Sequence, residues 1–224
     1  MIEVTQVAGL RRGRESALLD PRMSNVVVDV GHTGILTRIS ASEYLCDDGV
    51  MDFSLERSSA VLIRTPETLR TLLLDIPDEW TTSDEGPGTW SPYHVLGHMA
   101  YIEESDWMDR TIKMLAESEP RTFEPVDREA GFARFEGWSM PDLLEHFSEL
   151  RAANLEQLAA LVSINDLERI GIHPTFGEVT LRQLLASWVV HDLNHLDQIV
   201  KTMAKQYRDA VGPWREFLPI IDAP

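Results

Sequence analysis

Three histidines in this sequence have the spacing needed to bind one metal ion together. His191 and His195 are four residues apart in a segment of helical apolar periodicity. A helix therefore places both imidazoles on one face, about one turn apart. His98 lies in a second segment of this kind and could supply a third nitrogen. Three imidazoles that leave one coordination position open are typical of catalytic sites in which the metal activates water or binds a thiolate.

The alternative is that these histidines are core residues whose nitrogens form ordinary hydrogen bonds. Two inward-facing imidazoles opposite a third leave several polar nitrogens in an apolar interior, where an unpaired polar group is unfavourable. A shared metal satisfies these nitrogens together, and we therefore favour His98, His191 and His195 as metal ligands. His94 lies one turn before His98, but its position in the first helical turn indicates a solvated residue.

Polar residues near the histidines are candidates for supporting roles. Glu103 follows His98 by five residues, a spacing that turns its side chain away from a position as co-ligand. It could act across the interior as a catalytic, proton-handling group; the alternative is a solvated acidic face shared with Glu104. Asp192 and Asn194 could orient the imidazoles, as groups around metal ligands do, although surface exposure explains them equally well.

Other catalytic sites are excluded because their motifs are missing. Di-iron bundles need Glu-x-x-His on two helices, and zincin proteases need His-Glu-x-x-His; the sequence has neither. It also lacks a Gly-x-Ser-x-Gly elbow and a phosphate-binding glycine loop. The single cysteine, Cys46, lies outside the part of the chain that carries the histidines. A cysteine nucleophile therefore has little support.

Four amphipathic helices are expected to position these residues. They cover about residues 65–76, 92–116, 139–162 and 180–205, and a short helical lead-in over 55–63 precedes the first. Thr65 and Ser91 are expected N-caps with proline at the first helical position, and Thr180 opens the last helix with a capping box that Gln183 completes. The inward face of the second helix is expected to contain Val95, Met99, Ile102, Ile112 and Leu115.

Four helices without a convincing set of strands predict an all-α four-helix bundle. Residues 117–138 form a long link between the second and third helices. A link of this length lets the chain recross the bundle, which leaves those two helices parallel and gives an up-down-down-up order. The start of the second helix and the end of the fourth then share one end of the bundle, and His98 and His195 lie at similar depths.

The same topology predicts what surrounds the histidines. His173, in the loop before the last helix, is expected at the opposite end of the bundle, too distant to bind the same metal. The crossover is expected to bring Phe123, Asp127 and Arg128 near the histidines. The C-terminal tail is expected to bring Trp214 to the same place.

Residues 1–50 differ from the remainder of the chain. They contain one β-like run, Val26 to Val30, and no long helical pattern. We therefore expect two parts, a weakly ordered N-terminal extension over 1–50 and the bundle domain over 51–224. Met51 resembles an ordinary start, so the true start codon is one open question. The alternative is a strand that docks on the domain or on a partner.

Composition limits the partners and the compartment. The 224 residues include 37 acidic and 20 basic side chains, which give a formal net charge of −17. Binding to nucleic acid or to an anionic membrane needs a basic face, and the one basic cluster, Arg11 to Arg14, is followed by acidic residues. The apolar runs are too short to span a bilayer. One cysteine and no signal-peptide pattern favour the cytoplasm.

The residues around the histidines resemble the DinB-like (YfiT-like) superfamily, over about residues 55–210. The resemblance implies a four-helix bundle in which His98, His191 and His195 bind a divalent metal, most often nickel or zinc. It also implies a homodimer. The segments that carry the resemblance are Trp90-Ser91-Pro92, Gly97-His98, Glu103, Val179-Thr180-Leu181 and His191-Asp192-Leu193-Asn194-His195.

The resemblance leaves the reaction open. Members of the family include S-transferases that use the low-molecular-weight thiols bacillithiol or mycothiol, a maleylpyruvate isomerase that uses mycothiol, and proteins classed as metal-dependent hydrolases. One hypothesis is an enzyme whose metal activates water or a thiol for attack on an electrophilic small-molecule substrate. A second is a stress-response protein that binds a metal or ligand without turnover. A third is a purely structural dimer.

Overall fold

The computed structural model describes residues 25–26, 39–40, 51–117 and 121–223. The chain separates into two units, Met1–Asp52 and Phe53–Pro224. All the histidines proposed as metal ligands belong to the second unit.

In the first unit the structure describes two short strands. Strand β1 (Asn25–Val26) pairs with strand β2 (Ile39–Ser40) in antiparallel orientation. The rest of the β-like run after Val26, Cys46 and the arginine cluster lie outside the described residues. The role of residues 1–50 and the choice of Met51 as the start stay predictions.

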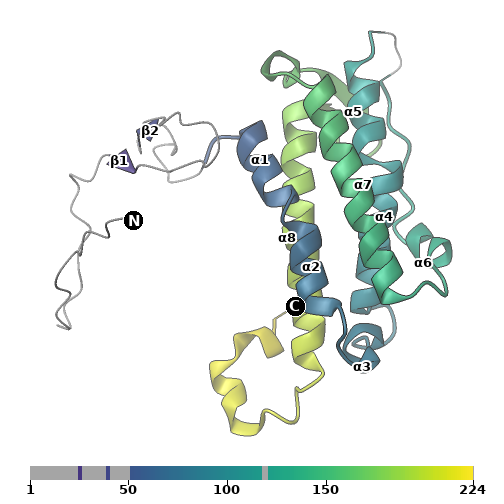
Figure 1. Ribbon diagram of the computed structural model, residues 1–224, viewed down its shortest axis with the longest axis vertical. Helices are drawn as coiled ribbons and strands as arrows, with labels where there is room; N and C mark the ends of the chain where they lie inside the picture. Colours follow the sequence, from purple (N-terminus) through teal and green to yellow (C-terminus); the bar gives the residue numbers. More distant parts are fainter. Residues whose placement is uncertain (1–24, 27–38, 41–50, 118–120, 224) are drawn as a thin grey trace, which may run out of the picture. The chain divides into compact units, whose positions relative to one another are not determined.

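The second unit is the predicted four-helix bundle (Figure 1). In Figure 1, α4 and α5 rise from the lower end of the bundle, and α7 rises in the same direction after the crossover. The pair α1–α2 and the last helix, α8, run the opposite way. The four columns are α1 (Leu55–Leu62) followed by α2 (Thr65–Leu73), α4 (Pro92–Ser105) followed by α5 (Trp107–Leu115), α7 (Met140–Leu161), and α8 (Leu181–Lys205).

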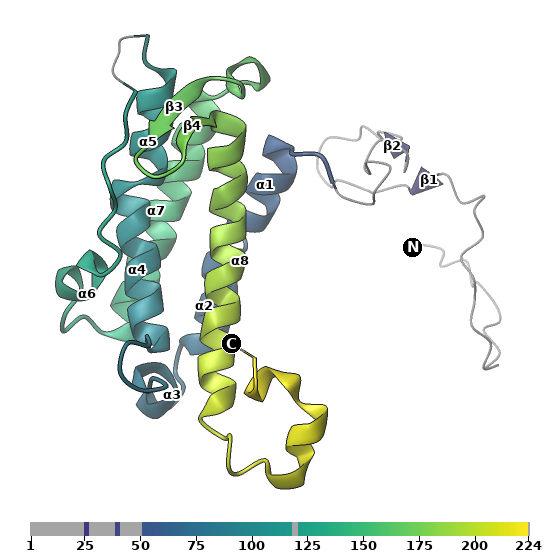
Figure 2. The same cartoon turned by 180° about the vertical axis from the view of Figure 1, so that it is seen from behind.

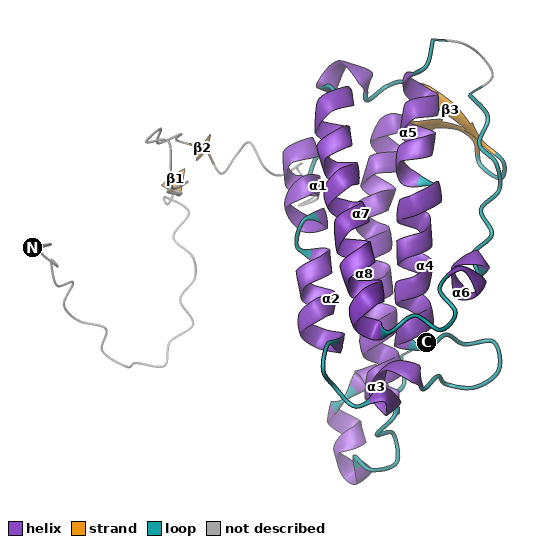
Figure 3. Cartoon of the chain, turned by 45° about the vertical axis from the view of Figure 1, so that its right-hand side comes forward, coloured by secondary structure: helices purple, strands orange, loops and turns teal. Residues whose placement is uncertain are grey.

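Short elements connect the columns. The sequence did not predict the hairpin of β3 (Ile170–His173) and β4 (Gly177–Thr180), which leads directly into α8 (Figure 2). Helices dominate the second unit all the same (Figure 3). The remaining short elements are α3 (Asp78–Thr82), α6 (Ala130–Arg134), η2 (Ile164–Asp166), η3 (Gly212–Phe217) and η4 (Pro219–Ile221).

Local capping explains where three of the columns begin. The Ser91 hydroxyl accepts a hydrogen bond from the His94 N–H, and the Ser139 hydroxyl accepts one from the Asp142 N–H. Thr180 and Gln183 form the predicted capping box. Each cap satisfies an amide that would otherwise lack a partner in the first helical turn. These predicted starts are therefore confirmed.

The predicted N-cap at Thr65 is wrong. The N-cap of α2 is Arg64, and Thr65 is the first helical residue. The Thr65 side chain is buried and its hydroxyl donates to the carbonyl of Val61 in the preceding helix. Helix α1 ends at Leu62, only three residues before Thr65, so the Thr65 hydroxyl bonds back to α1 instead of capping α2.

The predicted second helix is interrupted at Asp106. Its backbone angles, φ −128° and ψ −65°, are not helical and separate α4 from α5. The break changes the rotational phase of the apolar face. Ile112, expected inside, is 42% exposed, whereas Met108 and Met114 are buried in its place.

The bundle interior contains two clusters of buried apolar side chains. One includes Trp107 and Trp188, whose rings stack with centroids 5.5 Å apart, and the other includes Phe135 and Phe147. Burial of one large apolar side chain contributes about 1.5–3 kcal/mol, so these clusters stabilise the packing of the columns against one another. Within the described ranges, no helix is both long and apolar enough to cross a membrane.

Candidate metal centre

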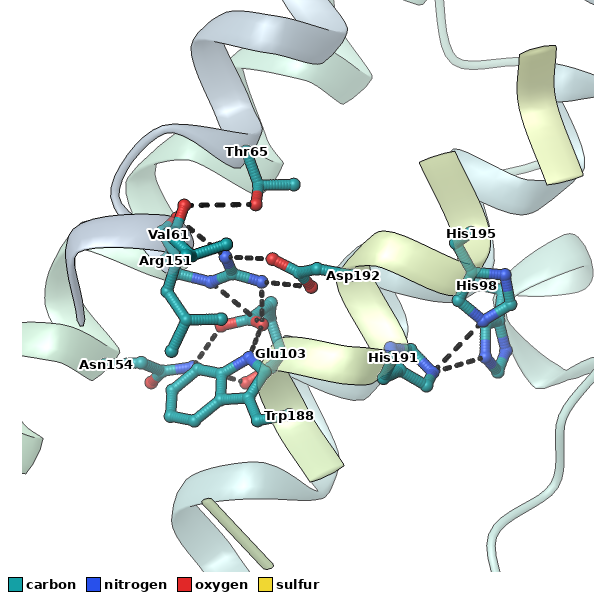
Figure 4. A network of polar contacts seen from close by, with 11 residues as sticks. Val61, Thr65, His98, Glu103, Arg151, Asn154, Trp188, His191, Asp192 and His195 are labelled. Carbon is teal, nitrogen blue, oxygen red and sulfur yellow. Dashed lines mark hydrogen bonds and ion pairs between the residues drawn. The ribbon is translucent and has the colours of Figure 1, made fainter. Parts of the chain in front are cut away.

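The structure brings the three predicted metal ligands together between α4 and α8 (Figure 4). His191 and His195 project from one face of α8 toward His98 on α4. The Nε2 atom of His191 lies 3.3 Å from Nε2 of His98 and 3.1 Å from Nε2 of His195. One ligand nitrogen from each residue lies within 4.8 Å of the others. Three nitrogens in this arrangement could hold a metal ion.

Hydrogen bonds on the far side of two rings fix which nitrogens face the centre. His98 Nδ1 lies 2.9 Å from the backbone carbonyl of Arg128, and His195 Nδ1 lies 2.8 Å from Oε1 of Gln198. Both oxygens accept hydrogen bonds, so each Nδ1 carries the proton and donates it. The Nε2 atoms of these two rings therefore face the centre as lone pairs, which is the form that binds a metal.

His191 makes the centre a poor fit for histidines alone. Its Nε2 faces two nitrogen lone pairs and can donate a proton to only one of them. Its Nδ1 is buried, and no group in the described part of the chain accepts a hydrogen bond from it. A cation removes the conflict at Nε2, because all three Nε2 atoms can then donate lone pairs, and the proton of His191 then resides on Nδ1. Zinc–nitrogen bonds of about 2.0–2.1 Å in a tetrahedron place the nitrogens roughly 3.3 Å apart, close to the two distances observed.

The electrostatics of the site keep the imidazoles neutral. Burial, reinforced by the neighbouring histidines, lowers the pKa of His98 to about 4 and the pKa of His191 to about 2. Burial also lowers the pKa of His195, although the hydrogen bond to Gln198 opposes it. Neutral imidazole is the ligating form, so the protein presents its nitrogens ready to bind a metal near neutral pH.

Two tryptophans enclose the histidines. The Trp90 ring lies 5.1 Å from the His98 ring and is nearly parallel to the ring of His195 at 6.5 Å. The edge of Trp107 meets the His191 ring at 5.2 Å. These aromatic rings pack against the imidazoles and restrict their rotation, and both tryptophans also line the cavity beside the histidines. Trp90 was predicted only as part of the family motif, and the contact of Trp107 with the histidines was not predicted.

The crossover brings Arg128 to the histidines as predicted, whereas Phe123 and Asp127 do not line the cavity beside them. A close approach of α6 to α4 holds it there, because a Cβ atom on Gly131 would lie 2.6 Å from the carbonyl oxygen of Gly97. Only a glycine at position 131 allows this contact, one residue from His98. The expectation for Trp214 is wrong: it is 69% exposed and does not line the cavity beside the histidines. The tail instead packs η4 against α8 and leaves η3 on the surface.

A cavity of about 960 Å³ opens beside the histidines. His173, expected at the far end of the bundle, also lines this cavity, because the β3–β4 hairpin carries it to the wall. It is not a member of the histidine group found among the described residues. His94, expected to be solvated, is half-buried, and its Nδ1 lies 3.0 Å from the Ser91 hydroxyl, also outside the group.

Asp106 is a cavity residue that the sequence analysis missed. Burial raises the pKa of its carboxyl group to about 6, although the Arg110 side chain, 2.6 Å away, opposes this shift. A carboxyl group that titrates near neutral pH can accept or return a proton in a reaction. Asp106 follows the buried Ile102 by four residues, and this spacing alone could have predicted that its carboxyl group faces inward.

Glu103 is not on a solvated acidic face. It is 3% exposed and belongs to a buried network next to the histidines (Figure 4). Its Oε1 accepts hydrogen bonds from Arg151 and Trp188, and its Oε2 accepts one from Asn154. Glu103 does not line the cavity. Its catalytic role stays a prediction. In the structure its hydrogen bonds join α4 to α7 and α8 next to the histidines.

Arg151 is the centre of this network. Its guanidinium lies 2.7 Å from Glu103 Oε1 and grips both oxygens of Asp192, at 2.6 and 2.9 Å. It also donates to the backbone carbonyl of Leu62. Burial disfavours the charge on Arg151, but the two carboxylates outweigh this effect and raise its pKa.

The two polar residues that flank the histidines on α8 differ in their surroundings. Asp192, next to His191 in the chain, is buried, and its carboxylate bonds to Arg151 on α7 rather than to an imidazole ring. Asn194 is exposed on the cavity wall.

Comparison with known proteins identifies the family and agrees with the fold. A sequence model of the DinB superfamily matches residues 62–199, a range that contains all three histidines. No curated protein sequence matches the chain at a significant level.

One solved structure, YfiT, shares the fold. YfiT from Bacillus subtilis, described as a probable metal-dependent hydrolase with an unusual four-helix bundle topology, is 19% identical; the match covers 73% of this chain and 94% of YfiT, with a TM-score of 0.58. The four-helix bundle protein TT2238 is 22% identical over 64% of this chain and 95% of its own, with a TM-score of 0.46. Since the family model spans more than half of the sequence, the chain belongs to the DinB superfamily.

Proposed function

We propose that this protein is a metal-dependent hydrolase that acts on a small-molecule substrate. His98, His191 and His195 hold a divalent cation, nickel or zinc. The observation that carries the proposal is the convergence of three Nε2 atoms while hydrogen bonds hold two of the rings from behind. YfiT, which shares the fold, is described as a probable metal-dependent hydrolase.

Different residues at and around the histidine centre have different roles in such a reaction. When bound, a divalent cation lowers the pKa of a coordinated water or thiol and supplies a nucleophile near neutral pH. Arg128 and Gln198 hold two of the imidazoles in the tautomer that binds metal. Trp90 and Trp107 pack against the imidazoles and hold the rings in place. Asp106, on the cavity wall, accepts the proton that the nucleophile loses and returns it to the leaving group.

Transfer to a thiol is the second candidate. The cavity of about 960 Å³ lies at the upper end of the range for small-molecule sites, about 300–1,000 Å³. That volume accommodates an electrophilic substrate together with a low-molecular-weight thiol such as bacillithiol or mycothiol. In this reaction the thiol takes the place of water as the nucleophile. The homodimer and the cytoplasmic location stay predictions.

Elemental analysis of the purified protein tests the metal site. We expect one nickel or zinc per chain, lost in His191→Ala and retained in the matched control His94→Ala. The metal-loaded protein is then screened against esters, amides and alkylating electrophiles, with and without bacillithiol, mycothiol or glutathione. Stoichiometric metal in His191→Ala would overturn the ligand assignment. Metal without turnover in any screen would favour a binding protein over an enzyme.

A further inference from the structure

The charged side chains of the cavity form ion pairs with one exception. The Arg110 guanidinium lies 2.6 Å from Asp106, and the ammonium groups of two lysines each lie close to a carboxylate. The two lysine pairs are Lys205 with Glu85, at 2.9 Å, and Lys201 with Asp197, at 2.7 Å. All six of these residues line the cavity. Their charges cancel pairwise, so they add little net attraction for a charged ligand.

Arg128 is the exception. It lines the same cavity and is exposed, and none of the described residues forms an ion pair or a hydrogen bond with its guanidinium. A cation without a carboxylate partner is unexpected in a chain with a net charge of −17. Its five N–H donors therefore remain available to a ligand.

The position of Arg128 ties this cation to the histidines. Its backbone carbonyl accepts the hydrogen bond from His98, and the Gly131–Gly97 contact holds the following turn against α4. Burial is the main cause of the low pKa of all three histidines, and the charge of Arg128 adds to it at each ring. Arg128 and the three histidines line the same cavity, so one ligand can contact both the guanidinium and the histidine centre.

We propose that Arg128 binds a carboxylate group of the natural ligand while the ligand's reacting end lies at the histidine centre. This proposal rests on the proposed function and adds a substrate class, small molecules that carry a carboxylate. A guanidinium binds a carboxylate with two parallel N–H···O hydrogen bonds. A singly charged group fits best, because one unpaired cation faces the cavity and a phosphate dianion would leave excess negative charge beside Asp106.

Two thiols of equal length test the proposal. 3-Mercaptopropionate and 3-mercaptopropan-1-ol bind a metal through the same sulfur and differ only in the charged end. Isothermal titration calorimetry on the zinc-loaded protein is expected to give about tenfold tighter binding of the carboxylate. Arg128→Met and Arg128→Gln are expected to abolish this preference without weakening the neutral thiol. Lys205→Met, which removes a paired cation, is expected to retain it.

The zinc content of each protein distinguishes a failure of this proposal from a failure of the proposed metal site. The side chain of Arg128 does not hold His98, so its variants are expected to keep stoichiometric zinc. Equal affinity for the two thiols in the zinc-loaded wild type, or a preference that both Arg128 variants keep, would overturn the role of Arg128 and leave the metal site standing. A wild-type protein that binds neither zinc nor nickel would overturn both proposals.

Discussion

Arg151→Met is expected to lower the free energy of unfolding by about 3–5 kcal/mol, because it leaves two buried carboxylates without their cation. The side chains of Arg151, Glu103 and Asp192 are only 2%, 1% and 1% exposed, so water cannot replace the lost partner. Glu103 retains donors from Asn154 and Trp188, whereas Arg151 grips both oxygens of Asp192. We therefore expect most of the loss to arise at Asp192.

Urea denaturation of the metal-free proteins, followed by circular dichroism, measures this change. In a chain of this size about 1 kcal/mol corresponds to 2–4 °C, so the thermal midpoint should fall by roughly 6–20 °C. The matched control is the triple variant Arg151→Met, Glu103→Gln, Asp192→Asn, which removes the carboxylate charges with the cation. It should recover much of the lost stability. A single variant that loses less than about 1 kcal/mol, or a triple variant no more stable than the single one, would refute the reasoning.

Two further predictions concern the histidines. Gln198→Leu removes the oxygen that accepts from His195 Nδ1 and should weaken zinc binding by about 10–100-fold, measured by competition with a chelator; unchanged affinity would show that this hydrogen bond does not orient the ring. The metal-free protein should lose stability as pH falls from about 6.5 through about 4, because the unfolded chain binds protons that folded His98 and His191 resist. Asp106, with its pKa raised to about 6, acts in the opposite direction but is outnumbered. Urea midpoints at pH 7 and pH 5 measure this effect, and equal midpoints would contradict it.

Features that depend on nearby residues were predictable from the sequence. The caps at Ser91 and Thr180 involve partners within three residues, and the His191–His195 spacing fixes a shared helical face. Together with the long crossover, these local patterns were enough to predict the bundle and the meeting of His98 with the pair. The same reasoning located Arg128 near the site, because the crossover must pass there.

Features that depend on distant partners were not predictable. The break at Asp106 moved Ile112 to the surface, although the apolar periodicity continued through it. Arg151 lies four residues after buried Phe147, on the inward face of the helix. A buried arginine is unfavourable without carboxylate partners, and its partners Glu103 and Asp192 are distant in the sequence, so its burial could not be predicted. The place of His173 on the cavity wall depends on a hairpin whose strands, among the described residues, pair with each other and with the crossover.

The guanidinium of Arg151 has a mechanical consequence for the whole molecule. It bonds to α4 through Glu103, to α8 through Asp192 and to the end of α1 through the Leu62 carbonyl, while it belongs to α7 itself. Apolar contacts between helices tolerate axial slip, because they have no preferred direction. The hydrogen bonds of the planar guanidinium are directional and do not tolerate slip. A shift of one residue, about 1.5 Å along the helix axis, would break them. Arg151 thus holds the four columns in register at the level of His191, which fixes the separation of the imidazoles that come from α4 and α8.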